Sequence, residues 1–333
     1  MIKKVLFFLI SLLAGFGIFF WVIQFVGWQE IKSAFLIFSG WHGIAILLTT
    51  GLMLFFGALK WQVILKSQGN HLPLKVLITS YWAGFSVAFL APMILFGGEL
   101  LKVYFLKSKG TIEAPKAYAS VIIDRILELT VYLLIIILGT VFFLFKVGLP
   151  AGKFGVILGL IILLFAGLTA FFYFKTIRKE SIIKIFVKKI ERNHGALETE
   201  KEVFSFFKLK RIEMWGCFGL TILRVLAVFL RTWLLVYFLL AKPLSFISIF
   251  SISSFYYLSY MIPIPTALGS HDAIQAFAFN ALGLGANTGT VFAIIIRGAE
   301  LIFALAGLLL LFRLGVSILG MNLFKKIGNL RGR

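Results

Sequence analysis

Residues 122–129 read IIDRILEL, and residues 294–301 read IIIRGAEL. The two stretches share the pattern Ile-Ile-x-Arg-x-x-Glu-Leu, and their arginines, Arg125 and Arg297, lie 172 residues apart (297 − 125). Both stretches lie inside long apolar runs, where charged side chains are rare because burying them in lipid is costly. The recurrence of one charged pattern in two such runs indicates an internal duplication.

A second pair of features recurs at nearly the same offset. Each motif follows an apolar segment that is interrupted by Pro and Gly and carries one acid. The acid is Glu99 in the first segment and Asp272 in the second, 173 residues later (272 − 99). Pro92 and Pro265 are separated by the same number (265 − 92). The duplicated unit therefore includes the interrupted segment as well as the charged motif.

The composition places the chain among membrane proteins. Of its 333 residues, 61% are hydrophobic and only 14% are charged, whereas a soluble domain carries about 25% charged residues. Several continuous apolar runs reach the roughly 20 residues that span a bilayer as a helix. A transmembrane barrel would instead alternate apolar and polar positions. The single Cys217 excludes an internal disulfide framework and a cysteine metal cluster.

We therefore predict an all-α polytopic membrane protein with about six full spans and two re-entrant hairpins. The spans are expected at about 5–26, 41–59, 117–145, 154–174, 213–240 and 291–312. Proline breaks helical hydrogen bonding and glycine permits tight turns, so interrupted segments favour hairpins. The expected hairpin backbone residues are Pro92, Gly97, Gly98, Pro263, Pro265 and Gly269.

Loop charge predicts the orientation. With a cytoplasmic N-terminus and two re-entrant hairpins, most of the 33 Lys and Arg face the cytoplasm, as loop charges usually do. The first hairpin then enters from the cytoplasm and the second from outside, so the repeats are inverted, and both termini are cytoplasmic. We expect one transmembrane domain, with repeat one at about 41–145 and repeat two at about 213–318. A basic linker at about 175–212, amphipathic around 182–190, joins them.

The buried charges are the candidate site. Arg125 with Glu128, and Arg297 with Glu300, have the i,i+3 spacing of pairs on one helix face. Such pairs either neutralise each other or face a central polar cavity. The expected substrate-binding or ion-binding residues are Glu99, Asp124, Arg125, Glu128, Arg224, Arg231, Asp272, Arg297 and Glu300.

The remaining charged positions allow more than one interpretation each. Glu99 and Asp272 follow glycines, so they either cap helix N-termini or bind a proton or a cationic headgroup where the hairpin tips meet. Arg224 and Arg231 are two helical turns apart, so they either bind phosphate, pair with Asp124 or Glu128, or extend to the membrane surface.

Other functional classes lack their signatures. The chain has no nucleotide-binding fingerprint and no zinc-ligand spacing. Ser270, His271 and Asp272 are consecutive, so their side chains diverge too far to form a catalytic triad. We therefore expect neither an enzyme nor a bound cofactor or metal. The excess of Lys and Arg on the cytoplasmic side predicts adhesion to anionic lipid heads rather than nucleic-acid binding.

Four stretches carry a family resemblance: PMILFGGELLK at 92–102, ASVIIDR at 119–125, PIPTALGSHD at 263–272, and Arg297. In this order they resemble the flippase-like integral membrane family, which includes the transmembrane flippase half of lysyl-phosphatidylglycerol synthase. Thr266 and Ala267 stand where that family usually has two glycines. At the acidic positions Asp and Glu are exchanged, which keeps the charge.

The resemblance implies a multi-pass protein of the cytoplasmic membrane that moves a lipid or lipid-linked headgroup between leaflets, with membrane lipid as its substrate. Because the chain ends at Arg333, soon after the last expected span, we expect no synthase domain. A secondary transporter of a small anionic solute and an accessory subunit without transport activity are the alternatives, and homo-oligomerisation stays open.

Overall fold

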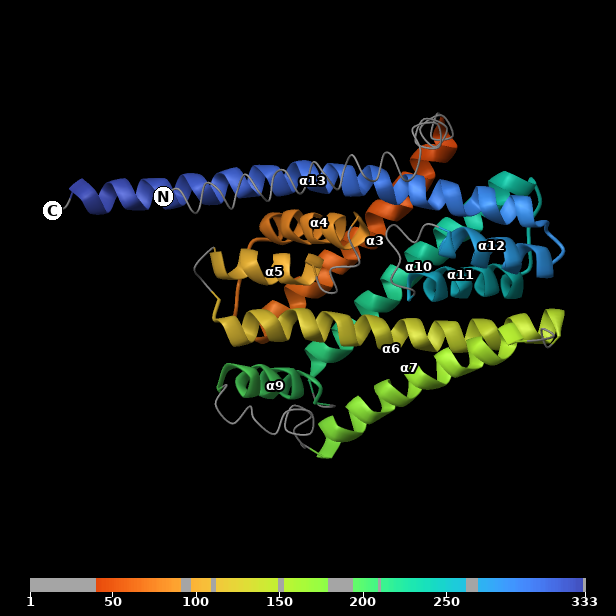
Figure 1. The fold of residues 1–333 in the computed structure, drawn as a ribbon, viewed down its shortest axis with the longest axis horizontal. Coiled ribbons are helices and arrows are strands. Elements are labelled where there is room, and N and C mark those ends of the chain that lie inside the picture. The colour runs from red at the N-terminus through yellow and green to blue at the C-terminus, as the bar shows by residue number, and fades with distance from the viewer. Residues whose placement is uncertain are drawn as a thin grey trace.

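The computed structural model describes residues 40–90, 97–108, 112–148, 153–178, 194–208, 211–261 and 269–331. Ten helices and no strand occur in this part of the chain (Figure 1). They are α3 (Trp41–Ser67), α4 (Leu74–Leu90), α5 (Gly97–Ser108), α6 (Ala114–Val147), α7 (Lys153–Arg178), α9 (His194–Phe206), α10 (Ile212–Leu240), α11 (Phe246–Tyr260), α12 (Ser270–Ala281) and α13 (Ala286–Arg331).

Local sequence sets several of these helix ends. A proline in the first turn of α6 has the backbone angle that a helix start requires. Gly148 ends α6 with a φ of 86°, and Gly269 precedes α12 with a φ of 75°, a region that glycine enters without steric cost. The Ser245 hydroxyl accepts a hydrogen bond from the Ser248 backbone N–H at 3.4 Å and so caps α11.

Four helices in the described part are long and apolar enough to cross a membrane: α3, α6, α10 and the Ala286–Arg313 part of α13. They match four of the expected spans. A fifth expected span, 154–174, falls on α7, and the first, 5–26, lies outside the described residues. Large apolar side chains face outward, including Leu48 of α3 and Leu226 of α10, as expected for helices surrounded by lipid.

The order of helices repeats at the offset of the sequence motif. The helices α10, α11, α12 and α13 begin 171 to 173 residues after α3, α4, α5 and α6 (212 − 41, 246 − 74, 270 − 97 and 286 − 114). In each set, a long helix is followed by two short helices and a second long helix. This regularity supports a duplication of the whole four-helix unit.

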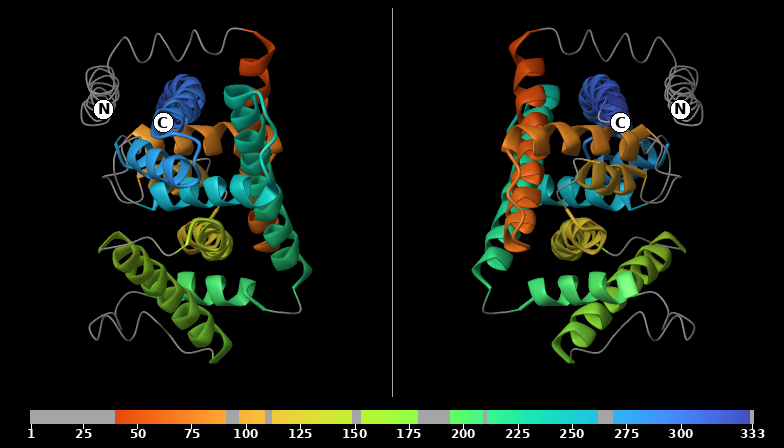
Figure 2. Two further views of the ribbon diagram at one scale, coloured as in Figure 1. Left: turned by 90° about the vertical axis from the view of Figure 1, so that its right-hand side faces the viewer. Right: turned by 90° about the vertical axis from the view of Figure 1, so that its left-hand side faces the viewer.

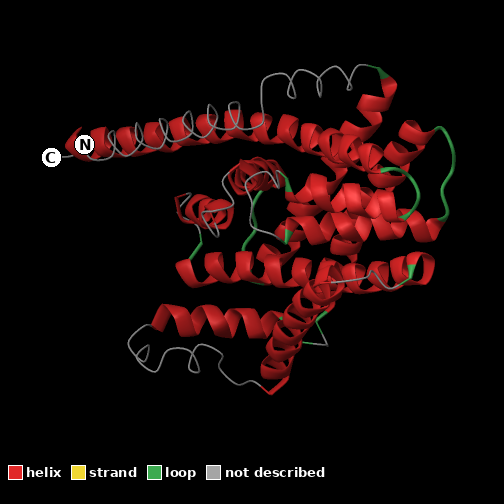
Figure 3. Cartoon of the chain, turned by 45° about the vertical axis from the view of Figure 1, so that its right-hand side comes forward, coloured by secondary structure: helices red, strands yellow, loops and turns green. Residues whose placement is uncertain are grey.

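The two sets interlock. In Figure 1, α6 and α13 run in opposite directions along the long axis, with the helix pairs α4/α5 and α11/α12 between them near opposite ends. In Figure 2, α3 and α10 lie side by side along one face of the molecule. α4 packs on α13, and α11 packs on α6. Each short pair thus contacts the last long helix of the other set, and Figure 3 shows that the described elements are all helices, with short loops between some of them.

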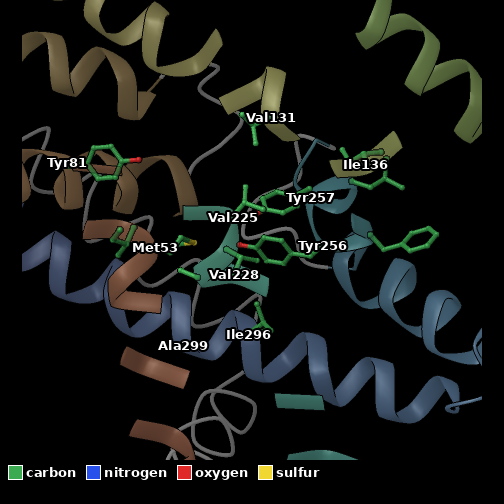
Figure 4. Packing of buried hydrophobic residues seen from close by; sticks show 14 of the residues in the cluster. Met53, Tyr81, Val131, Ile136, Val225, Val228, Tyr256, Tyr257, Ile296 and Ala299 are labelled. Atoms are coloured by element: carbon green, nitrogen blue, oxygen red, sulfur yellow. The ribbon is translucent and has the colours of Figure 1, made fainter. Parts of the chain in front are cut away.

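Two glycine contacts hold the sets close together. A Cβ atom added to Gly139 on α6 would clash with the side chain of Ser254 on α11. One added to Gly307 on α13 would clash with the side chain of Ser86 on α4. The two glycines and the two serines are each 168 residues apart (307 − 139 and 254 − 86), about one helical turn less than the repeat offset, so the two contacts are similar but are shifted by one turn. The apolar core contains residues from both sets of helices and includes Tyr256 (Figure 4).

The structure corrects some expected boundaries. α3 continues to Ser67, two turns beyond the expected end at residue 59, because the residues after Lys60 remain apolar and bury Trp61 and Ile64. α13 continues as one helix to Arg331. The expected amphipathic stretch around 182–190 lies outside the described residues. Within the linker the structure instead has α9, which packs on α6 through Phe206.

Candidate functional site

Polar side chains gather in two groups inside the helix bundle. The first cluster comprises Lys60, Tyr81, Glu99, Lys102, Asp124, Arg125, Glu128 and Arg224. The second cluster comprises Arg231, Tyr256, Tyr260, His271, Asp272, Arg297 and Glu300. The clusters are joined by α10, which contributes Arg224 to one and Arg231 to the other. All nine predicted charged residues therefore belong to one of the two clusters.

Glu128 is the centre of the first cluster. Its carboxylate accepts hydrogen bonds from Lys60 at 2.9 Å and from Arg125 at 3.0 Å, and it also pairs with Arg224. The hydroxyl of Tyr81 lies 3.5 Å from one of its oxygens. Glu128 is 2% exposed, so this acid is stabilised by ion pairs from three helices instead of water.

Asp124 is the second buried acid of the first cluster. It forms ion pairs with Lys60 at 2.8 Å and with Lys102 at 3.3 Å. The Lys102 ammonium also lies 4.0 Å from the centre of the Tyr81 ring, a cation–π contact. Both lysines are buried, so α3 and α5 each supply one cation to the same helix face of α6.

The first helix pair is connected to α6 by an ion pair between Glu99 and Arg125. Glu99 lies in the first turn of α5 and is buried. The Arg125 side chain is 41% exposed, so it is the most accessible cation of the first cluster's ion pairs.

Glu300 is the centre of the second cluster. It accepts hydrogen bonds from Arg231 at 3.0 Å and from Tyr256 at 2.7 Å, and a further one from Tyr260. Arg231 is fully buried and also donates to the hydroxyl of Thr50 at 3.2 Å. This acid is therefore satisfied by donors from α10 and α11.

Asp272 and Arg297 reproduce the connection made by Glu99 and Arg125. Asp272 lies in the first turn of α12, as Glu99 does in α5, and it binds Arg297 of the following helix at 2.6 Å. It also accepts a hydrogen bond from the Gly269 backbone N–H at 3.1 Å, so the capping interpretation is confirmed for this acid. Residues that are equivalent by offset therefore form equivalent ion pairs.

The expected i,i+3 pair is present in only one motif. Arg125 and Glu128 bind each other, whereas Arg297 and Glu300 each bind another residue, so of the two interpretations mutual neutralisation is wrong for the second motif. Glu300 instead accepts hydrogen bonds from Arg231 and two tyrosines, and Arg297 donates to Asp272. Pairing between Arg224 and an acid of α6 is confirmed, with Glu128 as the partner.

Sequence reasoning missed several members of the clusters. Lys60 and Lys102 are 0% and 4% exposed, and neither was among the predicted site residues. The apolar stretch that continues after Lys60 could have indicated that this lysine is buried. Nothing in the sequence indicated the tyrosines, because tyrosine is common in apolar helices. With these lysines, the first cluster has four cations and three acids, while the second has two of each.

The hairpin backbone residues are only partly described. Pro92, Pro263 and Pro265 lie outside the described residues, and the backbone of Gly97 begins α5. A Cβ atom at Gly98 would clash with the Gly84 carbonyl oxygen of α4, so this glycine permits close approach of the two arms. No group of three potential metal-ligating side chains occurs among the residues that the structure describes.

Comparison with known proteins places the chain in a family. Residues 8–307 match the family model of the lysylphosphatidylglycerol synthase transmembrane region. Neither the search of curated proteins nor the search of solved structures found a match. The match covers most of the chain, including every residue of the two clusters. The chain is therefore a multi-pass membrane protein that belongs to the lysylphosphatidylglycerol synthase transmembrane-region family.

Proposed function

We propose that this protein moves an anionic lipid, or a lipid-linked headgroup, between the leaflets of the cytoplasmic membrane. The observation that carries the proposal is the pair of equivalent ion pairs, Glu99–Arg125 and Asp272–Arg297, inside a member of this family. Each connects the first turn of a short helix to the next long helix. Breaking one pair while keeping the other would expose the interior toward one side at a time.

The cost of the buried charges supports a functional role. Removing one partner of a buried ion pair typically costs about 3–5 kcal/mol, so a large charged network is a risk to stability. Replacing a buried ion pair with apolar side chains of similar volume often leaves a protein equally stable or makes it more stable. Ionisable residues in membrane spans commonly mark a substrate or ion pathway. The excess cation of the first cluster favours a substrate that carries a negative charge.

The proposed membrane arrangement follows from the same features. The two helix pairs enter from opposite sides as re-entrant hairpins of inverted repeats, and the clusters lie near mid-depth. Both termini face the cytoplasm, where basic residues adhere to anionic lipid heads. Transport is driven by an ion gradient, the membrane potential or removal of the product, and the chain acts as a transporter rather than an enzyme.

A small anionic solute is the second candidate substrate. The first cluster has one cation more than it has acids, which suits an anion with or without acyl chains. A lipid keeps its tails in the bilayer while its headgroup crosses, whereas a solute is released into the vesicle lumen. The two candidates therefore differ in what a vesicle assay detects.

The test is a leaflet-specific assay in vesicles that contain the purified protein. Labelled phosphatidylglycerol should exchange between leaflets with the unmodified protein. Arg125→Ala and Arg297→Ala should each slow exchange at least about tenfold, the effect of losing roughly 1.4 kcal/mol of stabilisation. Lys66→Ala removes an exposed cation on α3 and serves as the control.

Each variant must elute as a single species of unchanged size, so that lost exchange is not lost folding. Exchange at the unmodified rate in both arginine variants would remove the ion pairs from the mechanism. Uptake of a soluble anion without lipid exchange would favour the second candidate.

A further inference from the structure

The two equivalent arginines differ in how many of their donors are used. In the first cluster, Arg125 donates through Nη1 to Glu128 and through Nη2 to Glu99. In the second cluster, Arg297 donates through Nη2 to Asp272, while its Nε and Nη1 atoms are buried and have no hydrogen-bond partner. Arg297 is 8% exposed, so water does not readily satisfy these donors. Buried donors without an acceptor are uncommon in proteins.

A buried histidine, His271, directly precedes Asp272, the residue that binds this arginine. His271 is fully buried in the first turn of α12, and neither ring nitrogen has a hydrogen-bond partner. Its ring lies 5.6 Å, centroid to centroid, from each of the rings of Tyr256 and Tyr260. Both tyrosine hydroxyls already donate to Glu300. The imidazole and the Arg297 guanidinium therefore bring several unused nitrogen atoms to one end of α12.

The first repeat has no space for a histidine side chain at the equivalent position. By offset, His271 and Tyr256 correspond to Gly98 and Gly84 (271 − 98 = 173 and 256 − 84 = 172). A Cβ atom on either glycine would meet the backbone of the other helix, so α4 and α5 are in direct contact there. In the second repeat, two aromatic side chains separate the helices at the same place. The difference is specific to one repeat and is not a requirement of the fold.

Both acids of the second cluster are already satisfied. Glu300 accepts from Arg231 and two tyrosines, and Asp272 accepts from Arg297 and the Gly269 backbone N–H. The first turn of α12 also carries the positive end of its helix dipole, which favours an anion. The Asp272 side chain is 23% exposed, so this end of the helix is accessible.

We infer that Arg297 and His271 form a binding subsite for a phosphate group, which the first repeat lacks. The inference rests on the proposed function and specifies it: the second cluster holds the phosphate of the transported molecule. Arginine suits this role because its planar guanidinium offers several fixed donors to phosphate oxygens. The same chemistry fits the phosphodiester of a lipid headgroup and free inorganic phosphate.

The test is equilibrium binding to the purified full-length protein in phosphate-free detergent solution, measured by calorimetry. The probes are inorganic phosphate, short-chain phosphatidylglycerol and, as the uncharged control, short-chain diacylglycerol. Arg297→Lys keeps a cation for Asp272 but removes the guanidinium donors, and His271→Gln removes the imidazole. His42→Gln makes the same exchange at an exposed position of α3 and is the matched control.

We expect one or both phosphate probes to bind, diacylglycerol not to bind, and each site variant to weaken phosphate binding about tenfold or more. Binding by phosphatidylglycerol alone would assign the subsite to a headgroup, and binding by inorganic phosphate as well would assign it to phosphate itself. The inference fails if neither probe binds, or if both site variants bind as His42→Gln does.

This outcome is independent of the transport assay. Lipid exchange that persists without measurable phosphate binding would overturn the subsite and leave the proposed function standing. Phosphate binding without exchange of lipid would overturn the proposed function and leave the subsite standing.

Discussion

At the scale of single residues, the interior depends on complete pairing of buried charge. Lys60 is fully buried, and its ammonium lies 2.8 Å from Asp124 and 2.9 Å from Glu128. An unpaired charge at such a position costs several kcal/mol, because neither water nor a counter-ion reaches it. The network of the first cluster is therefore sensitive to the loss of any one cation.

Lys60→Met should destabilise the protein by about 3–5 kcal/mol, because it leaves two carboxylates without a cation from α3. The measurement is the apparent melting temperature of the purified protein in detergent. Lys66→Met makes the same change at an exposed position of the same helix and should leave the melting temperature nearly unchanged. Equal stability of the two variants would show that Lys60 is not held by these acids.

The sequence predicts the residues of the site better than their partners. The offset identified Arg125 and Arg297 as equivalents, because charge inside apolar runs is rare enough to be informative. It did not predict that Arg297 binds Asp272 and leaves Glu300 to other donors. Side-chain pairing depends on which helices meet, and tertiary packing sets that. Lys60 was missed because a lysine at the end of an apolar run usually marks the membrane surface.

At the scale of helices, the first short helix of each repeat packs on the second long helix of the other repeat. α4 packs on α13 and α11 on α6, and each contact includes a glycine facing a serine. Small residues allow helix backbones to approach closely, which is a main source of stability between helices in membranes. The duplication of the elements was predictable from the sequence, but this exchange of partners was not, because no short-range pattern encodes it.

Gly139→Ala and Gly307→Ala should each destabilise the protein by about 1–3 kcal/mol, since the new methyl group overlaps Ser254 or Ser86. Combining Gly139→Ala with Ser254→Gly should restore most of the loss, because the side chain in the way is removed. Melting temperatures of the single and double variants give the coupling energy directly.

Gly219→Ala on α10 is the control for this series, because nothing lies within 4 Å of an added Cβ atom there. If Ser254→Gly does not improve the stability of Gly139→Ala, then the close contact between α6 and α11 is not what limits packing at Gly139.

In the protein as a whole, transport by alternating exposure requires two interlocked repeats of opposite orientation. α6 and α13 run in opposite directions, and the helix pairs α4/α5 and α11/α12 lie near opposite ends of them (Figure 1). The charged motif and loop charge predict the duplication and the opposite orientation of the repeats, but not their interlocking. The added length of α3 and the single long α13 were not predictable, because charged residues near the ends of spans are also common in loops.

The most direct test is the side of the membrane on which four single cysteines react with an impermeant thiol reagent. The substitutions are Lys66→Cys, Lys107→Cys, Lys146→Cys and Lys242→Cys, at exposed positions near helix ends, and the native Cys217 is buried. With inverted repeats and a re-entrant first hairpin, the first two should react from the cytoplasmic side and the last two from the opposite side. Reaction of the cysteines at 66 and 107 from opposite sides would contradict a re-entrant first hairpin, and with it the inverted repeat.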